Sequence, residues 1–373
     1  MAQRTRQDDD GYLVRLYEPR DRDEVLALWN DVLDKEPGEW FDWKFLDNPY
    51  LDATSICVTE RDGEVVGARP SFPLRLRVGD RSLLALVQVG AMVHPDHRRQ
   101  GLFTRMVDHL YDHFADREPT ASIGFPNDQA LAALENLDAR LSLNAGVVGR
   151  LRTYYRIQDP STLAGSGRLA TLSRAVTPAV RTYLAARDVT APSAPGVEVA
   201  HHDGVPAERL ASLASEHLPA AAHAVRDEQF YRWRFQHPRF EYETYVARRS
   251  GAPVAALVAG REPRASTTVV RISEALPLTG ARPAVLSHLL GRLVADSDDA
   301  ALVAAAGPRL PADVLREHGF LPDTGFALSS VTTRDNFVAR PLTDGDVTVW
   351  SHDGVRLSKR DCWAMSFCER ELG

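Results

Sequence analysis

Apolar and polar residues alternate in short runs over the first 160 positions, and turn-forming residues separate the runs. Residues 12–18 alternate as in a half-buried strand, and residues 55–60, 65–67 and 74–78 continue the strand pattern. Residues 83–93 are almost continuously apolar, which is typical of a buried strand. The region therefore predicts a sheet built from consecutive strands.

Helical spacing appears in the segments around these strands. A helix with Asp21 as its cap is expected to run to residue 32. After residue 93, apolar side chains recur with helical spacing at positions 103, 106, 107, 110 and 114. A strand over 121–125, a helix over 129–141 and a strand over 147–157 are predicted to complete this half of the chain.

A change in composition separates this half from the rest. Residues 161–167 are small and polar, residues 169–186 predict a helix broken at Pro178, and residues 191–196 have the composition of a linker. We therefore predict a flexible N-terminus over 1–11, a domain over 12–158, a linker with a helix over 159–196, and a second domain over 197–373.

The second half repeats the order of the first. Residues 230–238 resemble residues 40–49, since a Trp and a Phe lie two positions apart in both and a proline follows. Predicted elements then come in the same order, with strands over 242–248, 253–260 and 269–278, a helix over 284–295, a strand over 301–306 and a helix over 311–318. Chance similarity of the aromatic pattern is the alternative. Apolar residues at 363, 365 and 367 predict that the C-terminal segment packs on the protein.

Composition narrows the functional classes. With 44% hydrophobic and 25% charged residues the chain is ordinary for a globular protein. The net charge of −7 gives no reason to expect a nucleic-acid or membrane partner. Three cysteines without a Cys-x-x-Cys pair, no signal-like start and no long apolar run lead us to expect a cytoplasmic protein without a metal site.

One turn carries candidate chemistry. Pro95 ends the apolar strand, and Arg98, Arg99 and Gly101 lie between it and the following helix. The first turn of a helix presents unpaired backbone N–H groups, and the helix dipole adds partial positive charge. Such a turn predicts an anion site, most naturally for phosphate groups. A surface turn with solvated arginines is the alternative.

The residues of this turn resemble those of a known family. Val93-x-Pro95-x-x-Arg98-x-x-Gly101-Leu102-Phe103 is similar to the acyl-CoA signature of the GNAT N-acetyltransferase superfamily, Arg/Gln-x-x-Gly-x-Gly/Ala. Phe103 departs from the small residue usual at the last position. The resemblance implies an α/β (α+β) fold with two GNAT-like domains, each a mixed, mostly antiparallel sheet flanked by helices. The second copy would lack the CoA loop.

The resemblance also implies a site for acetyl-CoA as cosubstrate. In the family, loop amides hold the CoA pyrophosphate and a splayed strand end pairs with the pantetheine arm. Carried over to this chain, these roles fall on Met92, Val93, Arg98, Arg99, Gln100, Gly101, Leu102, Phe103 and Thr104. A residue at the next helix start often contacts CoA as well. Asn127 is the candidate, with a helix cap as the alternative.

Catalytic residues cannot be assigned from the sequence. The family polarises the thioester carbonyl with a backbone N–H, here near Val93, and often uses a carboxylate base and a tyrosine acid. The helix over 129–141 has no tyrosine, so that Tyr154 and Tyr155 on a later strand are weak substitutes. Gln88 lies where some relatives carry the base, but glutamine cannot abstract a proton. Further candidates, none of them preferred, are His94, Asp96, His97, Glu135, Glu274, Asp344 and Asp346.

Three functions remain open at this point. The first is transfer of an acetyl group to an amine of a small molecule or peptide by a monomeric or homodimeric enzyme. The second is a non-catalytic acyl-CoA sensor or scaffold, which the missing tyrosine favours. The third is aminoacyl transfer from tRNA, which the net charge of −7 opposes.

Overall fold

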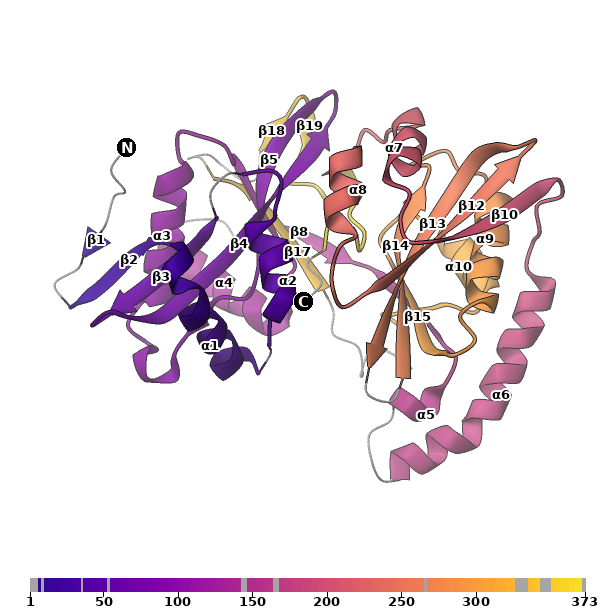
Figure 1. Ribbon diagram of the computed structural model, residues 1–373, viewed down its shortest axis with the longest axis horizontal. Helices are drawn as coiled ribbons and strands as arrows, with labels where there is room; N and C mark the ends of the chain where they lie inside the picture. Colours follow the sequence, from indigo (N-terminus) through magenta and orange to yellow (C-terminus); the bar gives the residue numbers. More distant parts are fainter. Residues whose placement is uncertain are drawn as a thin grey trace.

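The computed structural model describes residues 6–7, 10–34, 36–51, 54–141, 146–163, 168–264, 267–325, 335–342 and 350–370. Two mixed sheets lie side by side and helices cover their faces (Figure 1). The helices are α1 (Arg22–Leu33), α2 (Gly38–Phe41), α3 (Leu102–Phe114), α4 (Asp128–Leu141), α5 (Pro160–Leu163), α6 (Arg168–Thr190), α7 (Ala207–Glu216), α8 (Glu228–Arg234), α9 (Pro283–Ala295) and α10 (Ala312–Glu317). The predicted α/β class is confirmed.

The first sheet has ten strands, eight of them in the order β1-β2-β3-β4-β5-β7-β17-β8, while β6 and β11 pair with β4 outside this path. The strands are β1 (Arg6–Gln7), β2 (Tyr12–Leu16), β3 (Ile56–Arg61), β4 (Glu64–Val78), β5 (Arg81–Gln88), β6 (Met92–Val93), β7 (Ala121–Gly124), β8 (Val147–Leu151), β11 (His223–Ala224) and β17 (Asp335–Pro341).

The second sheet has seven strands in the order β10-β12-β13-β14-β15-β9-β16. They are β9 (Thr153–Ile157), β10 (Val197–Asp203), β12 (Glu241–Arg249), β13 (Ala252–Arg264), β14 (Thr267–Leu276), β15 (Ala300–Ala306) and β16 (Leu321–Pro322). A small hairpin of β18 (Ser351–His352) and β19 (Val355–Arg356) lies outside both sheets.

Both sheets contain the same run of strands. In the first, β3, β4 and β5 are antiparallel neighbours, and β7 pairs with β5 in parallel after the crossover helix α3. In the second, β12, β13 and β14 are antiparallel, and β15 pairs in parallel after α9. Mixed, mostly antiparallel sheets are therefore confirmed for both halves. That the second half is a copy of the first stays a prediction.

The two halves exchange strands. We predicted one strand over 147–157, and this was wrong, because the segment divides at Arg152 into β8 and β9. The strand β8 pairs with β17 in the first sheet, whereas β9 pairs with β15 in the second. Strand β17, from near the C-terminus, lies between β7 and β8. The alternating pattern continues across Arg152 because both pieces are strands, so it could not reveal that they belong to different sheets.

Prolines end fewer elements than predicted. Helix α6 continues through Pro178 instead of breaking there, since losing one N–H leaves the other hydrogen bonds of a 23-residue helix in place. Strand β4 is continuous where two strands were expected, although it contains Pro70 and Pro73. Both prolines still accept hydrogen bonds, from the Val89 N–H and the Asn48 side chain respectively.

The two aromatic segments that resemble each other in sequence pack against each other. The Trp43 and Trp233 rings stack with centroids 5.6 Å apart. Trp43 Nε1 donates to the Trp233 carbonyl at 2.7 Å, and Trp233 Nε1 donates to the Trp43 carbonyl at 3.0 Å. This reciprocal pair lies in a buried apolar cluster with members from both halves. These aromatic residues are therefore part of the core.

A buried ionic cluster joins the C-terminal segment to the second sheet. Arg226 Nε lies 2.7 Å from Glu274 on β14, and Arg226 Nη1 lies 2.6 Å from Glu369 near the chain end. All three side chains are at most 1% exposed. The aromatic and apolar residues at 363, 365 and 367 are also buried, so the predicted packing of the C-terminal segment is confirmed.

Candidate functional site

The long strand before the predicted loop is interrupted. Strand β5 ends at Gln88 and β6 resumes at Met92, and both pair with β4. In the gap, the Val89 N–H donates to the Pro70 carbonyl at 3.1 Å. Among the described residues, the N–H groups of Gly90 and Ala91 have no backbone acceptor. The interruption therefore leaves two donors free where the parallel pairing of β5 with β7 stops.

The loop after β6 presents a row of backbone donors. A short 3-10 turn over Pro95–His97 leads to Gly101, which caps α3 with a left-handed backbone at φ +74°. Within the described chain, no backbone acceptor is bonded to any N–H from Arg99 to Thr104. A Cβ placed on Gly101 would meet nothing within 4 Å, so a ligand can approach the backbone there. Six successive free donors at a helix start form an anion cradle.

Two exposed arginines flank this cradle. Neither Arg98 nor Arg99 has an ion-pair partner among the described residues. Arg98 Nε donates to the Val93 carbonyl at 3.1 Å, which connects the loop to the end of the strand. Arg99 has a positive φ of 65°. Together with the α3 dipole, these cations favour a phosphate group over a neutral one.

Met92 and Leu102 among the predicted cofactor residues can contact a cofactor only through the backbone. The side chains of Met92 and Leu102 are buried in apolar clusters. Asn127 Oδ1 accepts a hydrogen bond from the Ala130 N–H at 2.8 Å, so the residue makes the contact of a helix cap. A CoA contact by its remaining side-chain donors stays a prediction.

The large residue at position 103 has a structural partner. The Arg69 guanidinium on β4 lies 5.0 Å from the centre of the Phe103 ring. Arg69 is 4% exposed, and its Nε has no hydrogen-bond partner among the described residues. Burial lowers the pKa of Arg69. An aromatic ring at position 103 therefore covers a buried cation that the small residue usual in the family would leave open.

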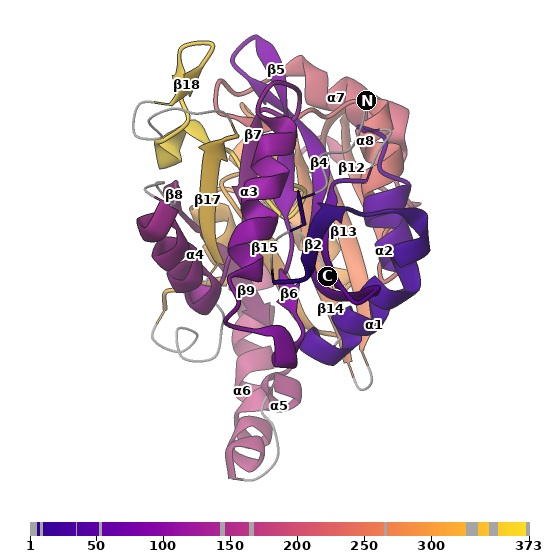
Figure 2. The same cartoon turned by 90° about the vertical axis from the view of Figure 1, so that its left-hand side faces the viewer.

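Sequence reasoning missed a tyrosine and an arginine on the same side of the sheet. Arg340 Nε on β17 donates to Tyr111 Oη on α3 at 2.6 Å, and the guanidinium lies 4.3 Å from the centre of the Tyr111 ring. Figure 2 shows β17 between α3 and α4. No sequence signal could have indicated that these residues are in contact, because they are 229 positions apart in the chain.

The tyrosines considered as catalytic acids lie elsewhere. Tyr154 and Tyr155 are on β9 in the second sheet, and Tyr154 packs in the apolar cluster of that half. Tyr154 is therefore a packing residue of the second sheet.

The carboxylate candidates have other environments. Glu135 on α4 is exposed. Glu274 is paired with Arg226. Asp344 and Asp346 lie outside the described residues.

The histidines of the loop make structural contacts. His94 Nδ1 accepts a hydrogen bond from the Asp96 N–H at 3.4 Å. His97 Nδ1 lies 3.0 Å from Tyr12 Oη, and the two rings meet edge to face. His97 thereby connects the loop to strand β2.

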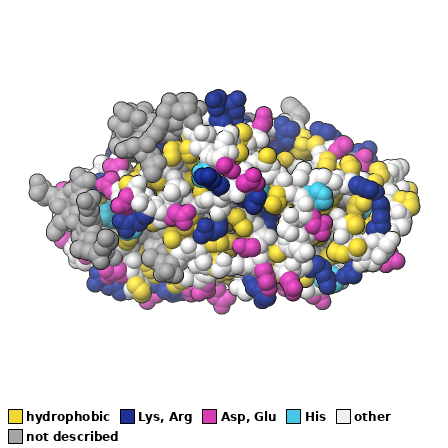
Figure 3. All heavy atoms as spheres, turned by 90° about the horizontal axis from the view of Figure 1, so that it is seen from above, with side chains coloured by type: hydrophobic (Ala, Val, Ile, Leu, Met, Phe, Trp, Pro, Cys, Tyr) yellow, Lys and Arg dark blue, Asp and Glu magenta, His cyan; other side chains and the backbone are white. Residues whose placement is uncertain are grey.

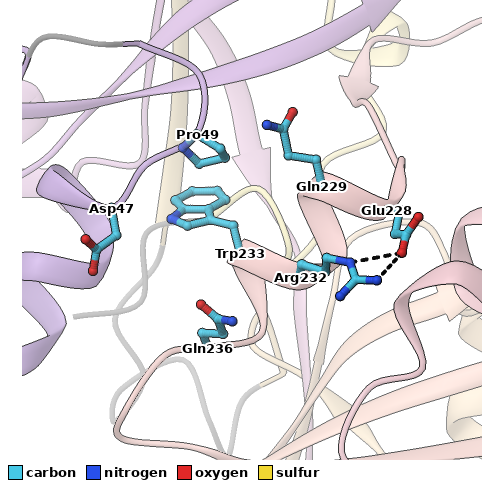
Figure 4. Close-up of a pocket in the computed structure, with 7 residues that line it drawn as sticks. All are labelled: Asp47, Pro49, Glu228, Gln229, Arg232, Trp233 and Gln236. Carbon is cyan, nitrogen blue, oxygen red and sulfur yellow. Dashed lines mark hydrogen bonds and ion pairs between the residues drawn. The ribbon is translucent and has the colours of Figure 1, made fainter.

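A separate pocket of about 420 Å³ lies at the junction of the two halves (Figure 4). The first half contributes Asp47 and Pro49, and the second contributes residues of α8 and the turn after it. Trp233 lies between Pro49 and Gln236, and Arg232 pairs with Glu228 at one side. The Trp233 ring also lies 6.0 Å from Phe72 on β4, so the pocket is on the inner side of the first sheet.

No curated protein matches the chain in sequence. Solved structures match its fold over both halves. A GCN5-related N-acetyltransferase from Anabaena variabilis superimposes with a TM-score of 0.58 at 10% identity, covering 89% of this chain and 73% of that one. A conserved protein of unknown function from Enterococcus faecalis, titled a probable N-acyltransferase, gives 0.59 at 10% identity and covers 89% and 72%.

The Saccharomyces cerevisiae N-myristoyltransferase, whose structure contains myristoyl-CoA, gives a TM-score of 0.59 at 10% identity over 90% of this chain and 80% of that one. At such identities the likeness concerns the fold. In sequence, residues 13–133 match the family described as acetyltransferase (GNAT) domain, and this span includes the interrupted strand, the loop and α3. The match supports acyl transfer as the general chemistry. Residues 13–133 of this chain therefore belong to the GNAT acetyltransferase domain family.

Proposed function

We propose that the protein transfers an acetyl group from acetyl-CoA to an amine. The observation that carries this proposal is the row of free N–H groups from Arg99 to Thr104, flanked by Arg98 and preceded by an interrupted strand. A pyrophosphate fits such a cradle because it needs several donors and positive charge at one place.

The same geometry suggests how the acyl group is activated. With the pyrophosphate at the start of α3, the pantetheine arm would run along β6 towards the interruption in the strand. There the free N–H groups of Gly90 and Ala91 can donate to the thioester oxygen and stabilise the negative charge that develops on it. The amine then attacks the carbonyl carbon directly, the C–S bond breaks, and the proton lost by the amine ends on the thiolate.

We place the acceptor at the junction of the two halves. The pocket beside Trp233 is built by both halves, which is what an acceptor site shaped by the second half requires. We propose an amine on a small molecule or a peptide and no nucleic acid, because basic and acidic side chains are interspersed on the face in Figure 3.

None of the described helices is long and apolar enough to cross a membrane. Free cysteines accord with the proposed cytoplasmic location.

A thiol-release assay with acetyl-CoA and a panel of amines tests the activity. The proposal requires CoA release that depends on both substrates and yields an N-acetylated product. Release of CoA by water alone, at the same rate with and without amines, contradicts it. The variant Arg98→Glu should lose most of the amine-dependent rate, because it places a carboxylate beside the pyrophosphate.

A non-catalytic acyl-CoA sensor is the second candidate. Tyr154 and Tyr155 lie in the other sheet, and helix α4 contains no tyrosine, which favours the sensor. Tight binding of acetyl-CoA without turnover of any amine would support the sensor.

A further inference from the structure

The interruption between β5 and β6 faces two sides of the first sheet. Phe72 on β4 points to the inner side, because its ring centroid lies 6.0 Å from that of Trp233 at the junction of the halves. Side chains alternate along a strand, so Arg69 and Ser71 point to the other side. Helix α3 covers this outer side, since Cys57, which pairs with Arg69, packs in one apolar cluster with residues of α3. A group held in the interruption can therefore extend either towards the junction or towards α3.

Arg69 and Phe103 lie together on the outer side of the interruption. On β4, Ala68 pairs with β6 and Ser71 pairs with β5, so Arg69 lies opposite the gap between these two strands. The Arg69 guanidinium is 5.0 Å from the centre of the Phe103 ring, which belongs to the first turn of α3. The two side chains are thus next to the free backbone N–H groups of the interruption.

Side chains fill the rest of the space between α3 and this part of the sheet. Arg69 is only 4% exposed. Gln88 pairs with Ser71 and so shares its face, and both amide atoms of Gln88 are buried. Further along the sheet, Arg340 on β17 donates to Tyr111 Oη on α3 at 2.6 Å. A ligand group that extends towards α3 would therefore have to displace side chains that are already in contact.

We propose that Phe103 and Arg69 restrict the acyl donor to short acyl groups such as acetyl and propionyl. The inference rests on the proposed acyl transfer at the interruption, where the amine reaches the thioester from the inner side. A chain that continues beyond the carbonyl carbon must then turn towards α3, where it meets the ring and the guanidinium. To pass, it would have to separate the ring from the buried cation and enter filled space, and both steps are unfavourable.

Amine-dependent thiol release tests this restriction. The assay compares acetyl-, butyryl- and octanoyl-CoA, each with the panel of amines. The kcat/KM of octanoyl-CoA should be about a hundredfold below that of acetyl-CoA, because its chain would overpack the outer side.

Three other results are decisive against a proposal. Equal kcat/KM values for acetyl- and octanoyl-CoA would overturn the inference although acyl transfer stands. A preference for succinyl-CoA over acetyl-CoA would also overturn it, because the Arg69 guanidinium would then bind an acyl carboxylate. If no acyl-CoA supports release with any amine, the proposed function itself fails.

Variants of the two side chains give the second readout, the kcat/KM of octanoyl-CoA divided by that of acetyl-CoA. Phe103→Ala removes the ring and should raise this ratio at least about tenfold, whereas Phe103→Leu keeps part of the volume and should raise it less. Arg69→Met keeps the length of the side chain and removes the buried charge, so that an alkyl chain can lie against it, and the ratio should rise as well.

The matched control is His113→Ala, which removes a ring from the last turn of the same helix and should leave the ratio unchanged. Partial unfolding of a variant lowers both rates alike, so the ratio is insensitive to it. An unchanged ratio in both Phe103→Ala and Arg69→Met would overturn the role of these two side chains.

Discussion

Arg226 offers a sharp test of how the chain end is held. The substitution Arg226→Met keeps the length of the side chain and removes its charge. It leaves Glu274 without a cation among the described residues, and it leaves Glu369 with Arg309 at 3.6 Å. Removing one partner of a fully buried ion pair costs about 3–5 kcal/mol, because the remaining charge stays buried. We expect a loss of this size in the free energy of unfolding at pH 7.

The pKa of Glu369 gives this cluster a pH dependence. Burial by itself raises this pKa, but Arg226 and Arg309 outweigh burial and lower it from 4.5 to about 2. A difference of this size corresponds to about 3 kcal/mol of stability. Because the pKa is lower in the folded state, the stability is fully present above pH 4.5 and is lost as the pH falls through 2. In Arg226→Met the buried carboxylates lose this cation, so burial raises their pKa. They then take up a proton as the pH falls from 7 towards 4.5, and the difference in the free energy of unfolding between wild type and variant should become smaller.

Urea unfolding at pH 7 and pH 5 measures both effects. The control is Arg232→Met in α8, which breaks an exposed pair with Glu228 and should change stability by no more than about 0.5 kcal/mol. A loss below about 1 kcal/mol in Arg226→Met would refute the reasoning, since a buried charge left without its partner should cost more. A deficit that does not narrow at pH 5 would refute the electrostatic explanation.

Two further predictions concern the junction of the halves. Trp43→Phe removes the donor to the Trp233 carbonyl and should lower the free energy of unfolding in urea by at least about 1–3 kcal/mol. The Tyr50 ring packs against Trp233, and its buried hydroxyl has no partner among the described residues. Tyr50→Phe should therefore leave the free energy of unfolding unchanged or raise it. A destabilised Tyr50→Phe would show that its hydroxyl is bonded after all. Burial lowers the pKa of His223 from 6.5 to about 4, so its contribution of about 3 kcal/mol is present above pH 6.5 and lost as the pH falls to 4. His223→Gln should flatten this part of the stability profile, and an unchanged slope would assign the effect to another group.

The sequence predicted most of the elements because their causes are local. Alternating side chains gave the strands, and helical spacing gave α3. The anion loop was also readable, because Pro95, Arg98 and Gly101 act on the backbone next to them. The similarity between the segments around Trp43 and Trp233 indicated related elements, although not that the two rings would stack.

What the sequence could not predict depends on distant partners. Strand β9 pairs in the second sheet and β17 in the first, and the local sequence pattern of a strand does not indicate which sheet it joins. For the same reason the Arg340–Tyr111 contact and the burial of Arg69 were not foreseen, since each needs an element from elsewhere in the chain. Gln88 was noticed only as a residue unable to serve as a base, and its unpaired amide became visible with the structure.

Calorimetry with acetyl-CoA tests the central claim most directly. The wild-type chain should bind one equivalent of acetyl-CoA. The variant Arg98→Glu with Gly101→Trp should weaken binding by at least about a hundredfold, or about 2.8 kcal/mol, because it reverses a charge and blocks the exposed amides. The matching change in the second half, Arg282→Glu with Gly280→Trp before α9, should leave the affinity unchanged. Equal affinities of the loop variant and the wild-type protein would contradict a CoA site at the start of α3.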